Sequence, residues 1–362
     1  PNSRCPASKV SRCFEQGDFT DFQTVYEFGK KVDILTIEIE KVNIEALFKL
    51  EEEGLVIHPG PSALLKIRDK GVQRTYLHES GIPGPGFHLV NDKEELKNFV
   101  KNNRIDIPFV QKAATGGYDG RGVKMVKNEN DLNDLLEGKA VVEDLVDIEK
   151  EISVIAARGL NGDVTCFPPV EMVFKKEANL LDYLMSPASI TRDQEMQVLQ
   201  LARKTIEKFN MIGLLAVEMF LTKTGDIFVN EVAPRPHNSG HHTIEASATS
   251  QYEQHLRAIL GLSLGPVSQN QFALMANLLG EKDASGKTHY LGLSECISEE
   301  GIHIHVYGKK KVSPYRKMGH VTILATTLKE AIDKLNFVRE TLKITSKEKL
   351  QENKDMRTSL TN

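Results

Sequence analysis

The stretch that decides the fold is LLAVEMFLTKTGDIFVNEV at residues 214–232, which is followed directly by APRPHNSGHH at residues 233–242. The turn signal KTGD in its middle separates two apolar-rich runs, so the stretch predicts a β-hairpin. A turn centred between the Thr and the Gly of this signal places Glu218 directly opposite Glu231. The two carboxylates then lie side by side on one face of the hairpin.

Such a pair needs an explanation, because like charges directly opposite each other destabilise a strand pair. Mg²⁺ offers one, since proteins hold it with one or two carboxylates together with phosphate oxygens of a substrate. In the competing interpretation the register slips and one glutamate faces solvent. The neighbours on the predicted face are apolar, namely Ala216, Phe220, Ile227 and Val229. They favour burial, so we predict a Mg²⁺ site at Glu218 and Glu231.

The hairpin leads into a turn that is dense in Arg, His and Asn. A turn of this composition, at the end of a strand that carries a metal ligand, is well placed to bind an anionic substrate. A single histidine is more often a hydrogen-bonded structural residue than a catalyst, but the clustering favours a role for Arg235 and His237. For His241 and His242 both interpretations stay open. A zinc site is disfavoured, because the chain has neither an HExxH motif nor a Cys/His ligand set.

A second candidate site is the glycine-rich run GGYDGRG at residues 116–122, between predicted strands at 108–113 and 123–126. It is not a Walker A loop, since no Lys-Ser/Thr follows it, and it is not a dinucleotide fingerprint, since a strand follows it instead of a helix. The bare N–H groups of such a turn can fold over a polyphosphate, and Lys112 would add a positive charge. A solvent-exposed hairpin turn explains the run equally well.

A basic run, YGKKKVSPYRKMGH, occupies residues 307–320. Runs of this kind are usually solvated faces. The spacing of its Gly, Pro and aromatic residues favours an ordered loop, in which Lys309 and Arg316 could bind a phosphate.

Length and composition limit the function classes. The 362 residues predict two or three domains, and 46 Lys and Arg against 50 Asp and Glu leave a formal charge of −4, which argues against a polyanion-binding protein. No apolar run approaches the roughly 20 residues that cross a bilayer. The four cysteines are scattered without a CxxC pair, which favours a reducing compartment, so we predict a cytoplasmic protein.

The predicted elements before residue 80 indicate a parallel α/β sheet, because strands and helices alternate there. Further along the chain, apolar periodicity predicts long helices at 193–209 and 327–342. The predicted elements of the first part are a strand at 32–40, a helix at 43–50, a strand at 55–58 and a helix at 63–79 with Ser62 as its N-cap.

Together these motifs resemble those of ATP-grasp ligases, and more narrowly the N5-carboxyaminoimidazole ribonucleotide synthetase family. The resemblance runs from residue 1 to about residue 345. Its specific parts are the RPHNSGH string and the YGK and RKMGH strings of the basic run, since a glycine loop with paired carboxylates would fit any ATP-grasp enzyme. Supporting matches are VEDLV at 142–146, TIEIEKV at 36–42 and Asp69-Lys70.

The resemblance implies an α/β fold, with α+β organisation in the ATP-grasp part, and three domains. These are an N-terminal pre-ATP-grasp domain at 1–65, an ATP-grasp domain at 66–265 and a small C-terminal domain at 266–345, before a polar tail at 346–362. The family opens with a strand and a glycine-rich loop that nothing here matches. We therefore expect an N-terminal truncation of about one βαβ unit, roughly 30 residues.

The implied activity is an ATP-dependent ligase of de novo purine (IMP) biosynthesis. It would join bicarbonate to 5-aminoimidazole ribonucleotide through carboxyphosphate, and give N5-carboxyaminoimidazole ribonucleotide. The resemblance further implies ATP and Mg²⁺ as cofactors, a homodimer, and no nucleic-acid or membrane partner.

The resemblance also assigns roles to single residues. Arg235 and His237 would face bicarbonate and the amine, and Glu218 and Glu231 would carry Mg²⁺. The substrate-binding residues would be Glu40, Asn238, Lys309 and Arg316. The ATP-binding residues would be Lys70, Lys112, Gly117, Tyr118, Asp119, Gly120, Arg121, Gly122, Val123, Glu143, Asp144, Leu145, Val146, Glu151, Asn230 and Glu231.

The chain departs from the family pattern at one motif, and two alternative functions stay open. Many members of the family have Glu-Asn-x-His where this chain has Glu171-Met-Val-Phe174, and phenylalanine cannot replace the hydrogen bond of that histidine. The ATP contact is then missing or is made by another group.

The first alternative is another ATP-grasp ligase, of the formate-dependent glycinamide ribonucleotide transformylase or biotin carboxylase type. The second is a nucleotide-binding paralogue or fragment without turnover.

Overall fold

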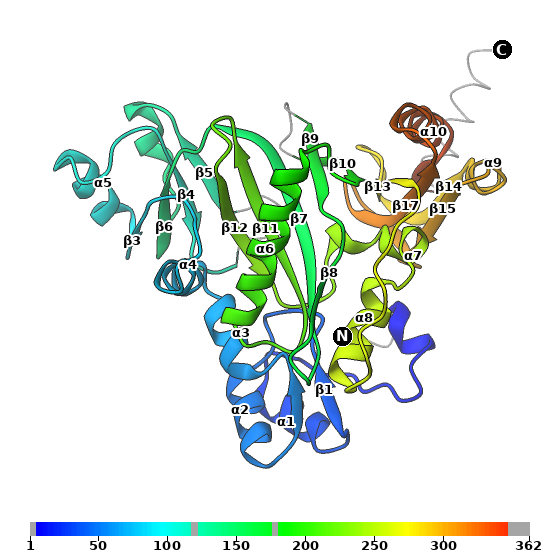
Figure 1. Ribbon diagram of the computed structural model, residues 1–362, viewed down its shortest axis with the longest axis horizontal. Helices are drawn as coiled ribbons and strands as arrows, with labels where there is room; N and C mark the ends of the chain where they lie inside the picture. The colour runs from blue at the N-terminus through cyan, green and yellow to red at the C-terminus, as the bar shows by residue number, and fades with distance from the viewer. Residues whose placement is uncertain (1–4, 117–121, 176–179, 347–362) are drawn as a thin grey trace.

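The computed structural model describes residues 5–116, 122–175 and 180–346, and its centre is one large sheet in the middle of Figure 1. Within these residues the sheet has nine strands, in the order β12-β11-β7-β9-β10-β13-β17-β15, with β8 paired to β7. All its pairings are antiparallel. The strands are β7 (Ile148–Arg158), β8 (Val164–Cys166), β9 (Val170–Lys175), β10 (Leu180–Ser186), β11 (Gly213–Thr222), β12 (Ile227–Ala233), β13 (Phe272–Leu279), β15 (Ile302–Val306) and β17 (Lys317–Ala325).

A small parallel sheet near the N-terminus confirms the predicted parallel arrangement. It consists of β1 (Ile34–Thr36) and β2 (Val56–His58), which are joined by α2 (Ile44–Glu52). The predicted strand at 32–40 was too long, because β2 offers only three residues for pairing and the chain then leaves the sheet. Glu40 therefore lies in the loop beyond β1. The short helices η1 (Pro6–Lys9) and α1 (Phe22–Gly29) precede this sheet.

The predicted helix at 63–79 is two helices, α3 (Pro61–Ile67) and α4 (Lys70–Glu79). Ser62 is not the N-cap, because Gly60 takes that place and a proline occupies the first helical position. A new helix begins at Lys70, since the Asp69 side chain accepts hydrogen bonds from the N–H groups of Gly71 and Val72. The correction matters for the site, because it places Lys70 in the first turn of α4.

A separate four-stranded sheet has the order β3-β6-β4-β5 and confirms the strands predicted around the glycine-rich run. It has its own hydrophobic core, which includes Leu96 and Phe109. The segment after β5 forms a 3₁₀ turn. The elements are β3 (Phe87–Val90), α5 (Lys93–Lys101), β4 (Phe109–Ala113), β5 (Val123–Val126), η2 (Glu129–Asp134) and β6 (Ala140–Asp144).

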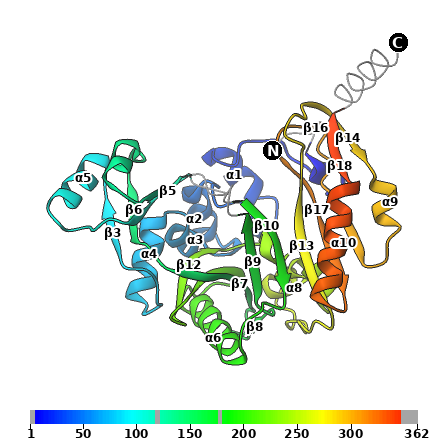
Figure 2. The ribbon, with the colours of Figure 1, turned by 90° about the horizontal axis from the view of Figure 1, so that it is seen from above.

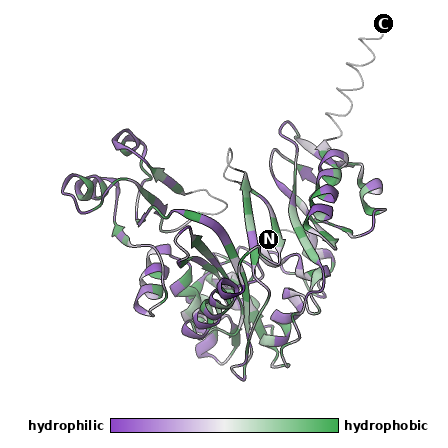
Figure 3. Ribbon diagram, turned by 45° about the horizontal axis from the view of Figure 1, so that its top comes forward, coloured by the Kyte–Doolittle hydropathy of each residue, from purple (hydrophilic) through white to green (hydrophobic). Residues whose placement is uncertain are grey.

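The long helix predicted at 193–209 is confirmed as α6 (Arg192–Lys208), which begins at a capping box on Thr191. Val198, Ala202 and Ile206 recur at helical spacing and are buried against β7 and β11. In Figure 1 this helix crosses the front of those strands. Figure 3 shows the corresponding contrast between hydrophobic central strands and hydrophilic outer surfaces of helices.

The C-terminal part continues the central sheet, because β10 pairs with β13. The predicted helix at 327–342 is confirmed as α10 (Leu328–Thr341), which packs on β13 and β17. Figure 2 shows these elements and the four-stranded sheet at opposite ends of the molecule. The remaining elements are η3 (Asn238–Gly240), α7 (Thr243–Ala246), α8 (Gln251–Ile259), β14 (Gly286–Leu291), α9 (Leu293–Ile297), β16 (Lys311–Val312) and β18 (Lys343–Ser346).

The sequence also bears on membrane-spanning segments and on the state of the cysteines. None of the helices there is long and apolar enough to span a bilayer. The four cysteines are all free thiols.

Candidate active site

The hairpin of β11 and β12 places Glu218 opposite Glu231, as the sequence predicts. The turn itself is centred slightly earlier than predicted, since Leu221 pairs with Ile227. A β-bulge then inserts one extra residue, Asn230, into β12 and brings Glu231 back to its predicted partner. The pair is confirmed, but its register depends on an irregularity that turn spacing does not reveal.

The surroundings of the two carboxylates differ. Burial, and then the charges of Glu231 and Glu151, raise the pKa of Glu218. Burial acts in the same direction on Glu231, but Lys70 contacts one of its oxygens and, together with Lys112, holds its pKa below the usual range. The Glu218 side chain is 18% exposed. A cation between the two oxygens would offset both the burial and the charge repulsion that raise the pKa of Glu218.

Lys70 reaches Glu231 from the first turn of α4. Its backbone N–H donates to the carbonyl of Ala114 at 2.8 Å, so the start of the helix is tied to the end of β4. Asp69 caps the same turn. Lys70 thereby connects three separate elements, because its backbone ties α4 to the end of β4 and its ammonium group reaches β12.

Lys112 on β4 is the second lysine at this point. Its Nζ lies 2.6 Å from Glu143 Oε2 and donates to Asn230 Oδ1 at 2.7 Å. Burial lowers the pKa of Lys112, against the opposing effect of Glu143. The Glu143 side chain is buried in an ion pair with Arg74 as well as with Lys112. Sequence reasoning assigned Glu143 to the adenine site and did not single out Arg74.

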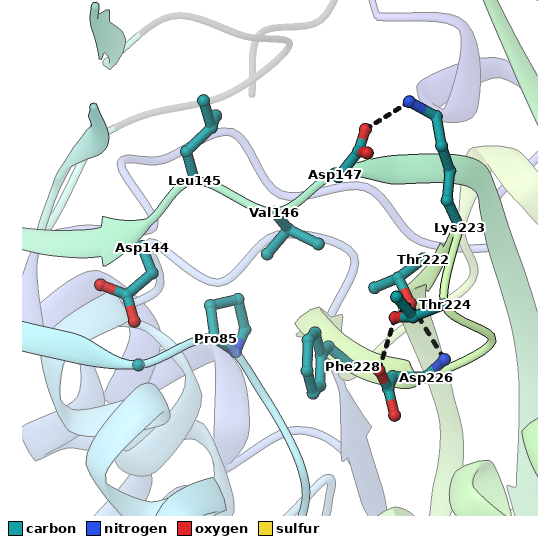
Figure 4. Close-up of a pocket in the computed structure, with 11 residues that line it drawn as sticks. Pro85, Asp144, Leu145, Val146, Asp147, Thr222, Lys223, Thr224, Asp226 and Phe228 are labelled. Carbon is teal, nitrogen blue, oxygen red and sulfur yellow. Dashed lines mark hydrogen bonds and ion pairs between the residues drawn. The ribbon is translucent and has the colours of Figure 1, made fainter. Parts of the chain in front are cut away.

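A pocket of about 300 Å³ lies beside this cluster, between the end of β6 and the hairpin turn (Figure 4). Figure 4 shows Pro85, Val146 and Phe228 around the pocket, whereas Leu145 points away from it. An apolar pocket edged by backbone is the kind of place that holds a flat aromatic base. Its lining residues include the predicted Asp144, Leu145 and Val146, together with Pro85, Gly86, Asp147, Thr222, Lys223, Thr224, Asp226 and Phe228.

Glu151 lies on β7, where it pairs with Phe220 of β11 and Met172 of β9. Burial raises its pKa to about 7, with Lys112 opposing and Glu231 adding to the effect. The charge of Glu151 is therefore coupled to those of Lys112 and Glu231, as expected of a residue in the same site. Phe174, the residue at the family's histidine position, lies on β9 opposite Leu181.

The turn after β12 connects two parts of the molecule. Arg235 Nε donates to Glu40 Oε1 at 2.8 Å, which joins the turn to the loop after β1. His237 Nε2 lies 3.6 Å from Glu218 Oε1, and Nδ1 contacts the Ser239 hydroxyl at 2.9 Å. The predicted pair Arg235 and His237 thus reaches Glu40 on one side and the carboxylate pair on the other. Asn238 follows as the first residue of η3 and is half-buried.

Lys309 and Arg316 lie in the connection between β15 and β17. Burial, and then the nearby charges of Arg316 and Lys317, lower the pKa of Lys309. Lys309 Nζ donates to the Lys317 carbonyl at 2.7 Å, and Arg316 Nη1 donates to the Lys311 carbonyl at 2.9 Å. The two predicted phosphate-binding residues are therefore neighbours, and both are attached to the backbone of their own loop.

Three histidine rings form a stack between the turn and the C-terminal strands. The ring of His320 lies 4.8 Å from that of His241 and 4.4 Å from that of His305. Burial is the main cause that lowers the pKa of both His241 and His320 to about 3, so both rings are neutral at pH 7. For His241 this supports a structural role. His242 is fully buried, and burial lowers its pKa to about 4.

Sequence reasoning also missed a repeated contact in which one glutamine amide pairs with both backbone groups of one residue. Each amide nitrogen donates to the carbonyl and each amide oxygen accepts from the N–H, as a neighbouring strand would. The pairs are Gln73 with Val232, Gln111 with Leu136, Gln251 with His237 and Gln254 with Gly265. The first and third hold the two ends of the segment from Val232 to His237. No local sequence signal marks such glutamines.

Part of the predicted site cannot be placed. Gly117, Tyr118, Asp119, Gly120 and Arg121 lie outside the described residues. Of the rest of that loop, the Gly122 carbonyl accepts from the Ala113 N–H at 2.8 Å and Val123 begins β5. Among the described residues, no group of three or more His, Cys, Asp or Glu is arranged to hold a metal. A metal at Glu218 and Glu231 would thus need ligands from the substrate or from water.

Comparisons with known proteins agree with this geometry. Sequence profiles match over residues 1–68 for the ribonucleotide synthetase preATP-grasp domain, 75–252 for the ATP-grasp domain and 273–334 for the phosphoribosylaminoimidazole carboxylase C-terminal domain. The N5-carboxyaminoimidazole ribonucleotide synthase of Bacillus subtilis is 34% identical over 328 residues, which are 90% of this chain and 83% of that protein. This chain belongs to the N5-carboxyaminoimidazole ribonucleotide synthase family.

Solved structures of the family show the same fold. The crystal structure of the Thermotoga maritima synthetase is similar with a TM-score of 0.86 and 40% identity, and the match covers 94% of this chain and 90% of that chain. The Aspergillus clavatus synthase, in complex with ADP and 5-aminoimidazole ribonucleotide, has a TM-score of 0.82 at 28% identity, with 92% and 89% covered.

Other members of the comparison are longer than this chain. They are named phosphoribosylaminoimidazole carboxylase, and the one from Vigna aconitifolia is named as chloroplastic. This chain covers 61% of the Vigna protein and 60% of the one from Saccharomyces cerevisiae.

Proposed function

We propose that this chain uses ATP to carboxylate 5-aminoimidazole ribonucleotide with bicarbonate, and gives N5-carboxyaminoimidazole ribonucleotide for purine biosynthesis. The observation that carries the proposal is the group of Lys70, Lys112, Glu218 and Glu231 beside an apolar pocket. It combines phosphate-binding cations, a paired carboxylate site and room for a base, as phosphoryl transfer from ATP requires. The Aspergillus clavatus synthase, named as a complex with ADP and 5-aminoimidazole ribonucleotide, supports this acceptor.

The residues present fit Mg²⁺. Two carboxylates lie opposite each other, and the pKa of Glu218 is raised by burial and by its neighbours Glu231 and Glu151, as expected of a site built for a cation. Two protein ligands are enough for Mg²⁺, because this ion usually keeps water molecules and substrate phosphate oxygens as its other ligands. When bound, the ion neutralises charge on the phosphate oxygens during transfer.

The proposed carboxylation proceeds in two steps. A bicarbonate oxygen attacks the γ-phosphorus of ATP, the bond from that phosphorus to the ADP oxygen breaks, and carboxyphosphate forms. The exocyclic amine then attacks the carboxyl carbon, inorganic phosphate leaves and the amine nitrogen loses a proton. In this scheme Lys70 and Lys112 hold the phosphates, Arg235 orients bicarbonate, and His237 accepts the proton.

Phosphate release in the presence of Mg·ATP tests the proposal. We expect release that needs both bicarbonate and 5-aminoimidazole ribonucleotide, with ¹³C from bicarbonate recovered in the product. Formate with glycinamide ribonucleotide, and bicarbonate with biotin, serve as alternative substrate pairs. Faster release with either of these pairs would assign the chain to another ATP-grasp activity. Nucleotide binding without release under any condition would support a non-catalytic paralogue.

The assembly and the compartment belong to the same proposal. We expect a homodimer, which light scattering on the purified chain would measure as twice the mass of one chain. The free thiols of Cys5, Cys13, Cys166 and Cys296 support a reducing compartment such as the cytoplasm. Cell fractionation with an antibody against the chain would separate this from an organelle.

A further inference from the structure

Among the described residues, β12 is an edge strand of the nine-stranded sheet, so one side of its backbone has no strand partner there. Backbone groups on a covered edge need other hydrogen-bond partners. Gln73 on α4 supplies two of them. Its Oε1 accepts from the Val232 N–H at 3.1 Å, and its Nε2 donates to the Val232 carbonyl at 3.4 Å and to the Ile67 carbonyl at 3.0 Å. The amide therefore acts as a short piece of neighbouring strand beside Glu231.

Arg74, the next residue on α4, binds the bulge itself. Its Nη1 donates to the Val229 carbonyl and its Nη2 to the Asn230 carbonyl, each at 2.6 Å. Successive carbonyls of a regular strand point to opposite sides. At this bulge both reach one guanidinium, whose planar fork can take two acceptors at once. The single ammonium group of a lysine lacks that geometry.

Arg74 also connects the bulge with the four-stranded sheet. Its Nε donates to Glu143 Oε1 at 2.8 Å, and the other Glu143 oxygen lies 2.6 Å from Lys112 Nζ. The side chains of Arg74 and Glu143 are only 5% and 4% exposed. Because the pair is shielded from water, the positions of its partners depend closely on its geometry. One arginine thus contacts both the strand that carries Glu231 and the carboxylate that holds Lys112.

We propose that Gln73 and Arg74 are positioning residues of the nucleotide site. They fix Glu231 and Lys112 relative to each other, through β12 and through Glu143, and their amide and guanidinium groups are taken up by these protein contacts. The inference rests on the proposed function only in taking this site to bind Mg·ATP, and it is independent of the acceptor. Partners that orient ligand-binding groups typically change affinity or activity about 10–100-fold when they are lost.

The test compares two variants with two matched controls. Gln73→Leu removes an amide that pairs with Val232, and Gln254→Leu removes a similar amide that pairs with Gly265 away from the site. Arg74→Lys keeps a charge but loses the fork, and Arg339→Lys makes the same change at the ion pair of α10 with Asp182. Each control loses contacts of the same kind without changing β12.

Calorimetric titration with Mg·ATP, and separately with adenosine, gives the readout on the full chain. We expect Gln73→Leu and Arg74→Lys to bind Mg·ATP about tenfold more weakly, as for other orienting partners. Both should bind adenosine as the unmodified chain does, because the pocket between β6 and the hairpin turn contains neither residue. Affinity for Mg·ATP equal to that of the controls would overturn the proposal. An equal loss of affinity for Mg·ATP and for adenosine would also overturn it, because a general destabilisation of the fold would weaken the binding of both ligands.

A third variant keeps the proposal testable if Arg74→Lys does not fold. A Cβ atom on Gly84 would lie 2.5 Å from Arg74 Nη1, so Gly84→Ala displaces the guanidinium without removing it. It should weaken Mg·ATP binding in the same way as Gln73→Leu, and unchanged binding in both would overturn the inference. An unmodified chain that binds Mg·ATP but releases no phosphate with the ribonucleotide would overturn only the proposed function. A chain that binds no Mg·ATP would overturn the positioning role.

Discussion

Glu218 is the residue on which function and stability make opposite demands. It lies opposite Glu231, and burial together with that neighbouring charge raises its pKa. A neutral side chain of the same shape would remove the repulsion between the strands. The same change would remove one of the two carboxylates that we assign to Mg²⁺. Sites that hold ligands often keep such unfavourable charges at the expense of stability.

We therefore predict that Glu218→Gln lowers kcat/KM about 100-fold or more, because a group that stabilises charge in phosphoryl transfer is lost. The same variant should be more stable than the unmodified chain, by up to about 1 kcal/mol. Phosphate release and urea denaturation measure the two effects. Glu330→Gln, at the start of α10, is the control and should leave activity unchanged. Unchanged ATP hydrolysis in Glu218→Gln would show that the metal assignment is wrong.

His320 makes stability depend on pH in a defined window. It is 2% exposed, and burial, with a contribution from His305, lowers its pKa to about 3. An unfolded chain binds a proton at this residue below about pH 6.5, whereas the folded chain does not until about pH 3. The contribution to stability is thus fully present above pH 6.5 and is lost as the pH falls towards 3. Each pH unit in that window costs about 1.4 kcal/mol for one such group.

We expect the free energy of unfolding to fall between pH 6 and pH 4, and to fall less steeply in His320→Gln. Glutamine keeps an acceptor for the Tyr307 hydroxyl, which contacts His320 Nδ1 at 2.9 Å, but it does not titrate. Urea denaturation at several pH values measures the slope. His88→Gln, at an exposed position of β3, should keep the slope of the unmodified chain. Equal slopes in both variants would contradict the prediction.

At the scale of elements, the start of α4 determines where Lys70 lies. Asp69 Oδ1 accepts from the N–H groups of Gly71 and Val72 at 2.8 and 3.0 Å. Without that cap the first turn of the helix would fray, since its N–H groups would lack partners. The α5 helix begins in the same way, because Asp92 caps its first turn with two hydrogen bonds of 2.9 Å.

The caps of α4 and α5 are alike in geometry, so removing each one separates the loss of a cap from the loss of nucleotide binding. Asp69→Ala and Asp92→Ala should each lower stability by about 1 kcal/mol, as the loss of an N-cap usually does. Of the two, Asp69→Ala alone should also weaken Mg·ATP binding, by about tenfold, because the helix that it caps carries Lys70, which contacts Glu231. Thermal denaturation and calorimetry measure the two effects. A similar loss of nucleotide affinity in both variants would remove the special role of α4.

The elements also show what the sequence could predict. Alternation and turn signals predicted the β11–β12 hairpin and the strands β4 and β5, because those features are local. The partner of Glu218 was predicted correctly although the turn was placed slightly wrongly, since the bulge at Asn230 compensates. Gln73 and Arg74 were not predicted, because their partners on β12 lie more than 150 residues away and depend on how α4 packs against an edge strand. Tertiary contacts of that kind leave no pattern in a local window.

At the scale of the whole molecule, the predicted boundary near residue 266 falls inside a continuous sheet. β10 pairs with β9 on one side and with β13 on the other, so the hydrogen-bond ladder runs from the hairpin to the C-terminal strands. The apolar cores on the two sides are separate clusters. Between them lies a small cluster of Val170, Leu184 and Met275, one from each of the three strands. We infer that this cluster couples the two halves during unfolding.

This coupling gives the last prediction, which concerns hydrogen exchange. In the unmodified chain, amides of β13 should exchange as slowly as those of β7, because opening the shared sheet exposes both. Leu184 is fully buried, and Leu184→Ala should cost about 2–5 kcal/mol. It should also let β13 exchange faster than β7, because the contact between the halves is weakened. Leu335→Ala, a buried change on α10, is the control for a loss confined to the C-terminal core. If β13 already exchanges much faster than β7 in the unmodified chain, the continuous ladder does not unite the two halves, and residue 266 marks a true boundary of stability.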